Sequence, residues 1–336
     1  MRARGCSGAR SAPCWVTRYN LALTQLRLGD WVHGWQGYEA RWNFREVHRA
    51  PRTFRQPRWH GEMLEGRRIL LHAEQGLGDT IQFCRYVALV VARGGRPILQ
   101  VQAPVERLMR SLKVVRSGHV EVGILGAPPP PFDVECPLMS LPAVFGTLVE
   151  TVPWTGAYLG ADPEEVEGVR RNNLAAHPAG KERPRIGLAW AGNPRYKADP
   201  QRSMCLAVLV PLFRAIDAVW VSLQKGEAAQ QIASLPVGAF VHDGCSLDMD
   251  LAQTATLLAT LDLVVTTDTC IAHLAGAMGK PVWVLLPQLS DWRWMQHKKT
   301  TPWYPTARLF RQSRAGDWDS VLKPVIFALN SLFASE

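Results

Sequence analysis

Two short polar segments, each directly after a predicted strand, contain residue types able to move a proton or hold a phosphate. The first is Glu74-Gln-Gly-Leu-Gly-Asp79, in which Gly76 and Gly78 allow a tight turn and let a ligand approach the backbone. Asp79 falls at the start of the next helix, where the helix dipole favours a carboxylate and where Asp also serves as a cap. The segment therefore predicts either a proton acceptor at Asp79 or an ordinary helix start. It lacks the Gly-x-Gly-x-x-Gly spacing of a dinucleotide site.

The second segment covers residues 266–277, where an apolar strand ends in Asp268 and Thr269 and a helix of small residues begins near Cys270. Free amides in the first turn of a helix, together with the Thr269 hydroxyl, predict an anion site suited to a diphosphate. His273 lies four residues after Thr269 and so on the same helical face. We expect His273 either to contact the same phosphate or to pack in the core, which is the commoner role of a lone His.

A third polar segment follows the first predicted strand of the second half and contains Asn193, Lys197 and Arg202. Cations at the end of a strand would neutralise a departing diphosphate, although a solvated surface loop has the same composition. No Asp-x-Asp triplet follows a strand, and Asp248-Met-Asp250 is typical of a helix cap rather than of a metal site. The sequence therefore predicts a reaction without a metal or other cofactor.

The elements that position these segments alternate between strand and helix in residues 60–160 and again in 184–318. This order predicts two doubly wound α/β domains with parallel sheets, separated by the Pro- and Gly-containing stretch 160–184. Ligands in such domains gather at the carboxyl ends of the strands, which is where all three segments fall. Residues 319–336 predict a last amphipathic helix.

Composition and charge limit the class of protein. Hydrophobic residues make up 47% and charged residues 20% of the 336 residues, as in ordinary globular domains. Residues 1–60 carry +8 of the net charge of +9, which is not the spread expected of a nucleic-acid-binding enzyme. Seven separated cysteines without a C-x-x-C pair, no long apolar run and no signal peptide predict a cytoplasmic protein without a membrane span.

The N-terminal region predicts an irregular basic arm over residues 1–17 and two helices within 18–48, separated by Gly29-Asp30. The pattern through Leu26, Gly34 and Tyr38 resembles one tetratricopeptide repeat, and the alternative is an ordinary helical hairpin. A single repeat is not a stable array. It is therefore expected either to dock on the main body or to stack on repeats that precede this sequence.

From about residue 19 to 325, the chain resembles the tetratricopeptide-repeat glycosyltransferases related to the bacterial ADP-heptose:lipopolysaccharide heptosyltransferases. The resemblance rests on the segments 74–79, 190–193, 268–275 and 291–294, the last followed by Trp303-Tyr-Pro305. It implies a GT-B architecture, in which two Rossmann-like domains face each other across a cleft and the final helix returns to the N-terminal domain.

The resemblance also implies a metal-independent, inverting transfer of sugar from a nucleotide-diphosphate sugar to an acceptor hydroxyl of a glycan or protein. Asp79 would be the catalytic base, on an acceptor loop with Gln75, Gly76 and Gly78. Heptosyltransferases usually have Gly where this chain has Cys270. The residues implied to hold the donor diphosphate are Lys197, Arg202, Asp268, Thr269, Cys270 and His273, and those implied as nucleotide or cleft contacts are Asn193, Gln224, Lys225, Asp291 and Trp292, of which Trp292 is equally suited to interdomain packing.

Two other functions fit the same residues. One is a nucleotide-binding module that recruits a protein partner through the tetratricopeptide-like segment. The other is a nucleotide-sugar epimerase on the same architecture, which would need no acceptor. The sugar, the nucleotide and the acceptor depend on a few contacts that sequence patterns do not specify.

Overall fold

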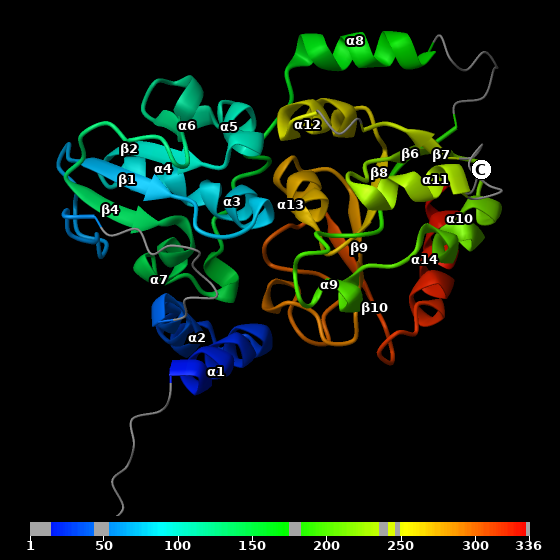
Figure 1. Ribbon diagram of the computed structural model, residues 1–336, viewed down its shortest axis with the longest axis horizontal. Helices are drawn as coiled ribbons and strands as arrows, with labels where there is room; N and C mark the ends of the chain where they lie inside the picture. Colours follow the sequence, from blue (N-terminus) through cyan, green and yellow to red (C-terminus); the bar gives the residue numbers. More distant parts are fainter. Residues whose placement is uncertain (1–14, 44–53, 175–182, 235–240, 246–248, 334–336) are drawn as a thin grey trace, which may run out of the picture.

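A computed structural model describes residues 15–43, 54–174, 183–234, 241–245 and 249–333 (Figure 1). Two α/β domains lie side by side, and a helical hairpin lies against both of them. The predicted α/β fold with parallel sheets is confirmed. None of the described helices combines the length and the apolar character needed to cross a bilayer.

The N-terminal domain contains a parallel sheet with the strand order β3-β2-β1-β4. The central strand β1 is buried along almost its whole length because helices cover both faces, so its sequence is a continuous apolar run. His72, the last residue of β1, pairs with Gln100 and Pro137, which aligns the carboxyl ends of three strands. The strands are β1 (Arg68–His72), β2 (Arg96–Val101), β3 (Glu121–Ile124) and β4 (Val134–Pro137), and the helices are α3 (Leu77–Phe83), α4 (Val87–Ala92), α5 (Ala103–Met109), α6 (Lys113–Arg116) and α7 (Leu141–Val144).

The C-terminal domain contains a six-stranded parallel sheet in the order β10-β9-β8-β5-β6-β7. Its central strands β8 and β9 are fully buried, and Thr267 at the end of β8 pairs with Leu285. The strands are β5 (Arg185–Ala189), β6 (Val219–Ser222), β7 (Val241–Asp243), β8 (Leu263–Thr267), β9 (Val282–Leu286) and β10 (Ala307–Arg311), and the helices are α9 (Asp199–Arg202), α10 (Val210–Ala215), α11 (Gln231–Ser234), α12 (Leu251–Ala259), α13 (Cys270–Ala277) and α14 (Asp319–Phe333).

Two parts of the chain differ from the sequence prediction. The stretch 160–184, expected to separate the two domains, contains helix α8 (Pro163–Leu174), which packs on α12 and was not among the predicted elements. Helix α14 does not return to the N-terminal domain: it packs on α10 and β10 and is drawn in red at the far side of the C-terminal domain in Figure 1. The cause is β10, an edge strand that the sequence patterns did not predict, because it gives the apolar stripe of α14 a surface within its own domain.

The N-terminal hairpin consists of α1 (Trp15–Leu28), α2 (Trp31–Tyr38) and the short 3-10 helix η1 (Glu39–Asn43). Helix α1 begins at Trp15, so residues 15–17 are helical rather than part of the expected arm, and residues 1–14 and 44–48 lie outside the described part. The helices approach closely at Gly34, where an added Cβ would lie 2.7 Å from the Leu26 side chain. A larger residue would push the helices apart.

The hairpin is docked on the main body. The Trp31 ring stacks on that of Trp303 in the C-terminal domain, with centroids 5.1 Å apart. The Trp35 indole nitrogen donates to the carbonyl of Thr147 in the N-terminal domain over 2.8 Å. The hairpin therefore joins the two domains.

Candidate functional site

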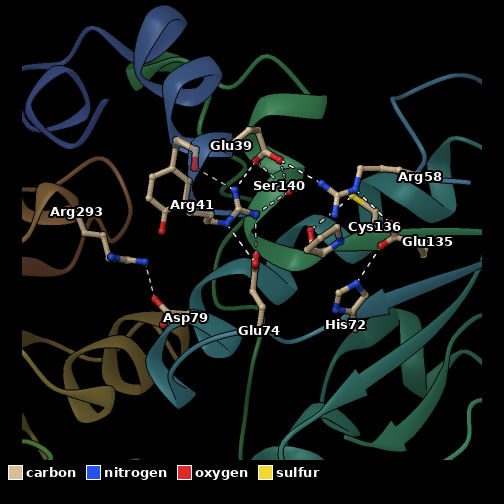
Figure 2. Close-up of polar contacts among 12 residues, drawn as sticks. Glu39, Arg41, Arg58, His72, Glu74, Asp79, Glu135, Cys136, Ser140 and Arg293 are labelled. Carbon is tan, nitrogen blue, oxygen red and sulfur yellow. Dashed lines mark hydrogen bonds and ion pairs between the residues drawn. The ribbon is translucent and has the colours of Figure 1, made fainter. Parts of the chain in front are cut away.

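The loop after β1 holds Asp79 in a fixed orientation. Helix α3 begins at Leu77, and the Gly76 amide donates to Oδ2 of Asp79 over 2.7 Å. Oδ1 accepts a hydrogen bond of 2.5 Å from Nη2 of Arg293, which belongs to the other domain (Figure 2). Burial raises the pKa of Asp79, and the positive charge of Arg293 partly opposes this rise. Asp79 is thus a helix cap and also a carboxylate at the contact between the domains.

Arg293 is a site residue that our sequence reasoning did not single out, although the Asp-Trp-Arg-Trp segment was noted. Its side chain is only 8% exposed and pairs with Asp291 over 2.8 Å as well as with Asp79. Nε donates to the side-chain oxygen Oε1 of Gln82 over 2.7 Å, and the guanidinium lies 4.3 Å from the Trp292 ring centroid. A lone Arg between two Trp, close to an Asp, was the available signal, but two of its partners, Asp79 and Gln82, come from the other domain.

The predicted anion segment forms the turn from β8 into α13. Thr269 is the N-cap of α13, and its hydroxyl accepts from the Ile271 amide over 3.3 Å. Asp268 is buried, and burial together with the charge of Asp291 raises its pKa to about 6, while Arg202 acts in the opposite direction. The turn therefore combines a helix N-terminus with a carboxyl group that is easily protonated.

Replacing Asp268 by Asn should change how stability depends on pH. The folded pKa of about 6 lies above the value of about 3.9 for an unperturbed Asp. Because the pKa of Asp268 is higher in the folded state, the free energy of unfolding of the wild-type chain falls by about 3 kcal/mol as the pH rises from about 4 through about 6. The Asn variant lacks this loss. Urea unfolding at about pH 4.5 and about pH 7 measures the free energy of unfolding of both proteins. The stability of the variant relative to wild type should be greater at about pH 7 than at about pH 4.5. An equal difference at the two pH values would contradict a buried, ionising Asp268.

His273 packs at the contact between the two domains. Its Nδ1 lies 2.9 Å from the Tyr304 hydroxyl, and its ring stacks on Trp294 with centroids 5.3 Å apart. Burial lowers the pKa of His273 well below its usual range, so the ring is neutral at pH 7. An ideal Cβ on Gly78 would lie 2.7 Å from Cδ2 of His273 and 3.5 Å from Cα of Cys270. The two predicted segments are therefore direct neighbours, and Gly78 leaves room for this contact.

The polar loop after β5 is only partly brought to this contact. Arg202 pairs with Asp199 over 3.1 Å and lies 4.9 Å from the Tyr196 ring centroid, and its charge lowers the pKa of Asp268. Asn193 and Lys197 are exposed. The side-chain oxygen Oδ1 of Asn193 accepts from the Arg195 amide over 3.0 Å, which stabilises the loop itself.

Gln224 is not available to a nucleotide, contrary to the expectation. Its side-chain oxygen accepts from the amides of Trp190 and Ala191 over 2.9 Å each, and its nitrogen donates to the carbonyls of Ala191 and Lys225 over 3.0 Å each. Two acceptor and two donor positions are all that a Gln amide has. Gln224 therefore fixes the start of the β5 loop. Lys225 donates to the Met249 carbonyl, and its charge acts on the Cys270 thiol.

Trp292 belongs to the interdomain core rather than to a sugar-binding surface. It is 2% exposed, and its ring contacts those of Trp35, Tyr38 and Trp303 at centroid distances of 5.3, 6.0 and 6.0 Å. Asp291 is more exposed and accepts from the Arg293 amide over 3.0 Å, which caps the short helix η8 (Trp292–Trp294).

The remaining acceptor-loop residue, Gln75, is anchored through its backbone. Its carbonyl accepts from the side chain of Gln102 over 2.9 Å, and its own side-chain nitrogen is buried without a hydrogen-bond partner among the described residues. Within the same part of the chain, no group of three or more His, Cys, Asp or Glu side chains is arranged to hold a metal ion.

Residues 245–316 match the model of glycosyltransferase family 9 (heptosyltransferase). This stretch includes β8, α13 and the Arg293 segment. Protein FlbA of Caulobacter vibrioides is 29% identical over 344 residues, which cover 95% of this chain and 56% of that protein. The chain therefore spans about half the length of this curated relative.

Two solved structures are similar in fold. The Escherichia coli ADP-heptose lipopolysaccharide heptosyltransferase II aligns with a TM-score of 0.51 and 14% identity over 79% of this chain and 98% of that one. A glycosyltransferase family 9 protein from Veillonella parvula aligns with a TM-score of 0.57 and 12% identity over 82% and 99% of the two chains. The family 9 match within 245–316 and the shared fold together support the interpretation of this chain as a glycosyltransferase.

Proposed function

We propose that this chain is a metal-independent, inverting glycosyltransferase that moves a sugar from a nucleotide-diphosphate sugar to an acceptor hydroxyl of a glycan or protein. The observation that carries the proposal is the contact between the Asp79 loop and the start of α13, where an added Cβ on Gly78 would lie 3.5 Å from Cα of Cys270. A carboxylate and a helix N-terminus on opposite domains are the base and the anion site that such a transfer needs.

On the donor side, the first turn of α13 binds the diphosphate. The first backbone amides of a helix, here that of Cys270, have no acceptor within the helix, and the helix dipole favours a negative charge there. Arg202 is the nearby cation whose charge already acts on Asp268. His273 is neutral, so it contributes a hydrogen bond rather than a charge. These groups stabilise the negative charge that develops on the leaving diphosphate.

On the acceptor side, Asp79 is the general base. The acceptor hydroxyl gives its proton to the Asp79 carboxylate as its oxygen forms a bond to the anomeric carbon of the donor sugar. The bond from that carbon to the diphosphate oxygen breaks on the opposite side, which inverts the anomeric centre. The hydrogen bonds from Gly76 and Arg293 hold the carboxylate in one orientation during this step.

The donor is identified by thermal shift with ADP-, UDP-, GDP- and CMP-sugars, followed by slow donor hydrolysis without acceptor. We expect one class of donor to stabilise the protein, by about 2.7 kcal/mol at 100 times its Kd. Hydrolysis should continue in excess EDTA. Strict dependence on a divalent cation would contradict the metal-independent mechanism, and the lack of any shift would contradict the donor site.

A matched pair of variants tests the position of the donor. Thr269→Asp keeps a side chain that caps α13 but places a negative charge at the anion site, whereas Thr269→Ser keeps both the cap and the neutral hydroxyl. The Asp variant should lose donor binding at normal stability, and the Ser variant should keep it. Donor that binds without release of nucleotide would indicate a binding module, and isomerised donor would indicate an epimerase.

A further inference from the structure

A chain of alternating charges joins the helical hairpin to the loop of Asp79 (Figure 2). At its centre is Arg41, on η1, whose side chain is fully buried. Nε and Nη2 donate to the two carboxylate oxygens of Glu74 over 3.2 and 2.9 Å. Nη2 also donates to Ser140 Oγ over 2.7 Å, and Nη1 donates to Glu39 over 2.5 Å. The guanidinium is therefore held in one position, and its paired bonds fix Glu74.

The chain of charges continues into the sheet behind the loop. Glu39 accepts from Arg58 over 3.4 Å, Arg58 donates to Glu135 over 3.2 Å, and Glu135 pairs with His72 over 3.0 Å. Because His72 ends β1 and Glu135 lies on β4, Arg41 is connected to the rigid sheet on one side and to the loop on the other.

Glu74 is the first residue of the loop, and its side chain is 3% exposed. Two residues later, Gly76 donates the hydrogen bond to Asp79 Oδ2. We infer that Arg41 is a positioning residue, which fixes the start of this loop through Glu74 and so holds Asp79 in the orientation that accepts a proton. The inference rests on the proposed function, in which Asp79 is the base.

The ion pair is not needed to attach the hairpin. Trp31 and Trp35 already dock the hairpin on both domains. A buried ion pair adds little stability compared with apolar packing, because desolvation offsets the attraction. What an Arg–carboxylate pair with two parallel bonds adds is orientation, and Lys cannot reproduce it. The pair therefore acts on the geometry of the loop.

Arg41 also affects Asp79 through charge. Glu74 lies near enough to raise the pKa of Asp79, so a Glu74 without Arg41 would raise it further. Removal of the Glu74 charge would lower it. The other groups that face Asp79 are Arg293 and Asp291 from the C-terminal domain, Tyr38 from α2, and His273, which is neutral and lies against the neighbouring Gly78. None of these residues is itself replaced in the Arg41 and Glu74 variants, although Arg41 also lies 4.9 Å from the centroid of the Tyr38 ring.

Four variants, Arg41→Met, Arg41→Lys, Glu74→Gln and the double variant Arg41→Met/Glu74→Gln, are compared with wild type in donor hydrolysis. We expect kcat of Arg41→Met to fall about 10- to 100-fold with donor KM nearly unchanged, because a misplaced base costs rate rather than binding. The kcat of Arg41→Lys should lie between those of wild type and Arg41→Met. The acidic limb of the kcat profile should move to higher pH in Arg41→Met, to lower pH in Glu74→Gln, and back toward wild type in the double variant.

Hydrogen–deuterium exchange gives a second readout that does not need activity. The Gly76 amide should exchange more than about tenfold faster in Arg41→Met, because the loop loses its anchor. Arg67→Met, which removes a 40% exposed Arg from a 3.8 Å surface pair with Glu62, is the matched control and should change neither readout.

Opposite shifts of the acidic limb in the Arg41 and Glu74 variants support the inference. An unchanged kcat and profile, or shifts in one direction only, would overturn it. If Arg41→Met does not fold, kcat and the shift of the acidic limb in Glu74→Gln and Arg41→Lys test the inference instead. A failure of the proposed function looks different, since wild type would then hydrolyse no donor, or Asp79→Asn would be as active as wild type.

Discussion

Asp79→Asn should lower the turnover of sugar transfer or donor hydrolysis by about 10²- to 10⁴-fold, which is the usual contribution of a general base. The Asn amide has the same shape as the carboxylate and can still accept from Gly76 or Arg293, so the loop should keep its fold. It cannot take a proton. Donor affinity, measured by thermal shift or calorimetry, should remain nearly unchanged because the proposed site of the diphosphate is at α13.

Asp291→Asn is the matched control for this prediction. Asp291 is the other carboxylate on Arg293, 2.8 Å from Nη1, and it is about one third exposed. Its removal leaves Arg293 paired with Asp79, so the pKa of Asp79 should fall and turnover should decrease only moderately. Wild-type turnover in Asp79→Asn would remove the proposed base. A large loss in Asp291→Asn with none in Asp79→Asn would assign the base to Asp291.

The sequence predicted best the parts of the fold that depend on neighbouring residues. An apolar strand, a glycine turn and a helix start are contiguous in residues 68–79, and an apolar strand also runs directly into a helix start in the segment that contains Thr269. Because the carboxyl ends of parallel strands carry the loops of such domains, the approximate place of both segments also followed from the alternating order.

The cross-domain contacts could not be predicted in this way. Arg293 lies 214 positions from its partner Asp79, and no local pattern specifies that pair. The same applies to Gln224, whose type suggested a ligand contact but whose amide is used by backbone groups of another loop. The packing of α14 depended on β10, an edge strand whose pattern was too weak to recognise. In each case the deciding partner is distant in sequence.

In the hairpin, too, the local features were predictable and the contacts with distant residues were not. Its two helices and the turn at Gly29-Asp30 followed from local signals, and Asp30 does cap α2. Its docking face was not predictable, because the Trp residues that receive it lie near the other end of the chain. Trp31 and Trp35 are buried against this chain, so these two rings contribute to its stability.

Trp303→Ala should destabilise the protein by about 3–5 kcal/mol, as expected for truncation of a fully buried aromatic side chain. Trp303 is 0% exposed and stacks on Trp31 of the hairpin. It also contacts Phe83 of the N-terminal domain with centroids 5.7 Å apart. The substitution therefore leaves a cavity where three parts of the chain meet. The structure around such a cavity relaxes only partly, so the lost contacts are not replaced.

Urea unfolding followed by circular dichroism measures this loss without relying on Trp fluorescence, which the substitution itself changes. Trp15→Ala removes a Trp that is 52% exposed, and it should cost less than about 0.5 kcal/mol. In Trp303→Ala, trypsin should also cut faster after Arg27. The hairpin loses the ring that holds it, so Arg27, whose Nε donates to the Ser290 carbonyl in a part-buried hydrogen bond, becomes more accessible. A loss as small as that of Trp15→Ala, with unchanged cleavage, would mean that the hairpin does not depend on this aromatic contact.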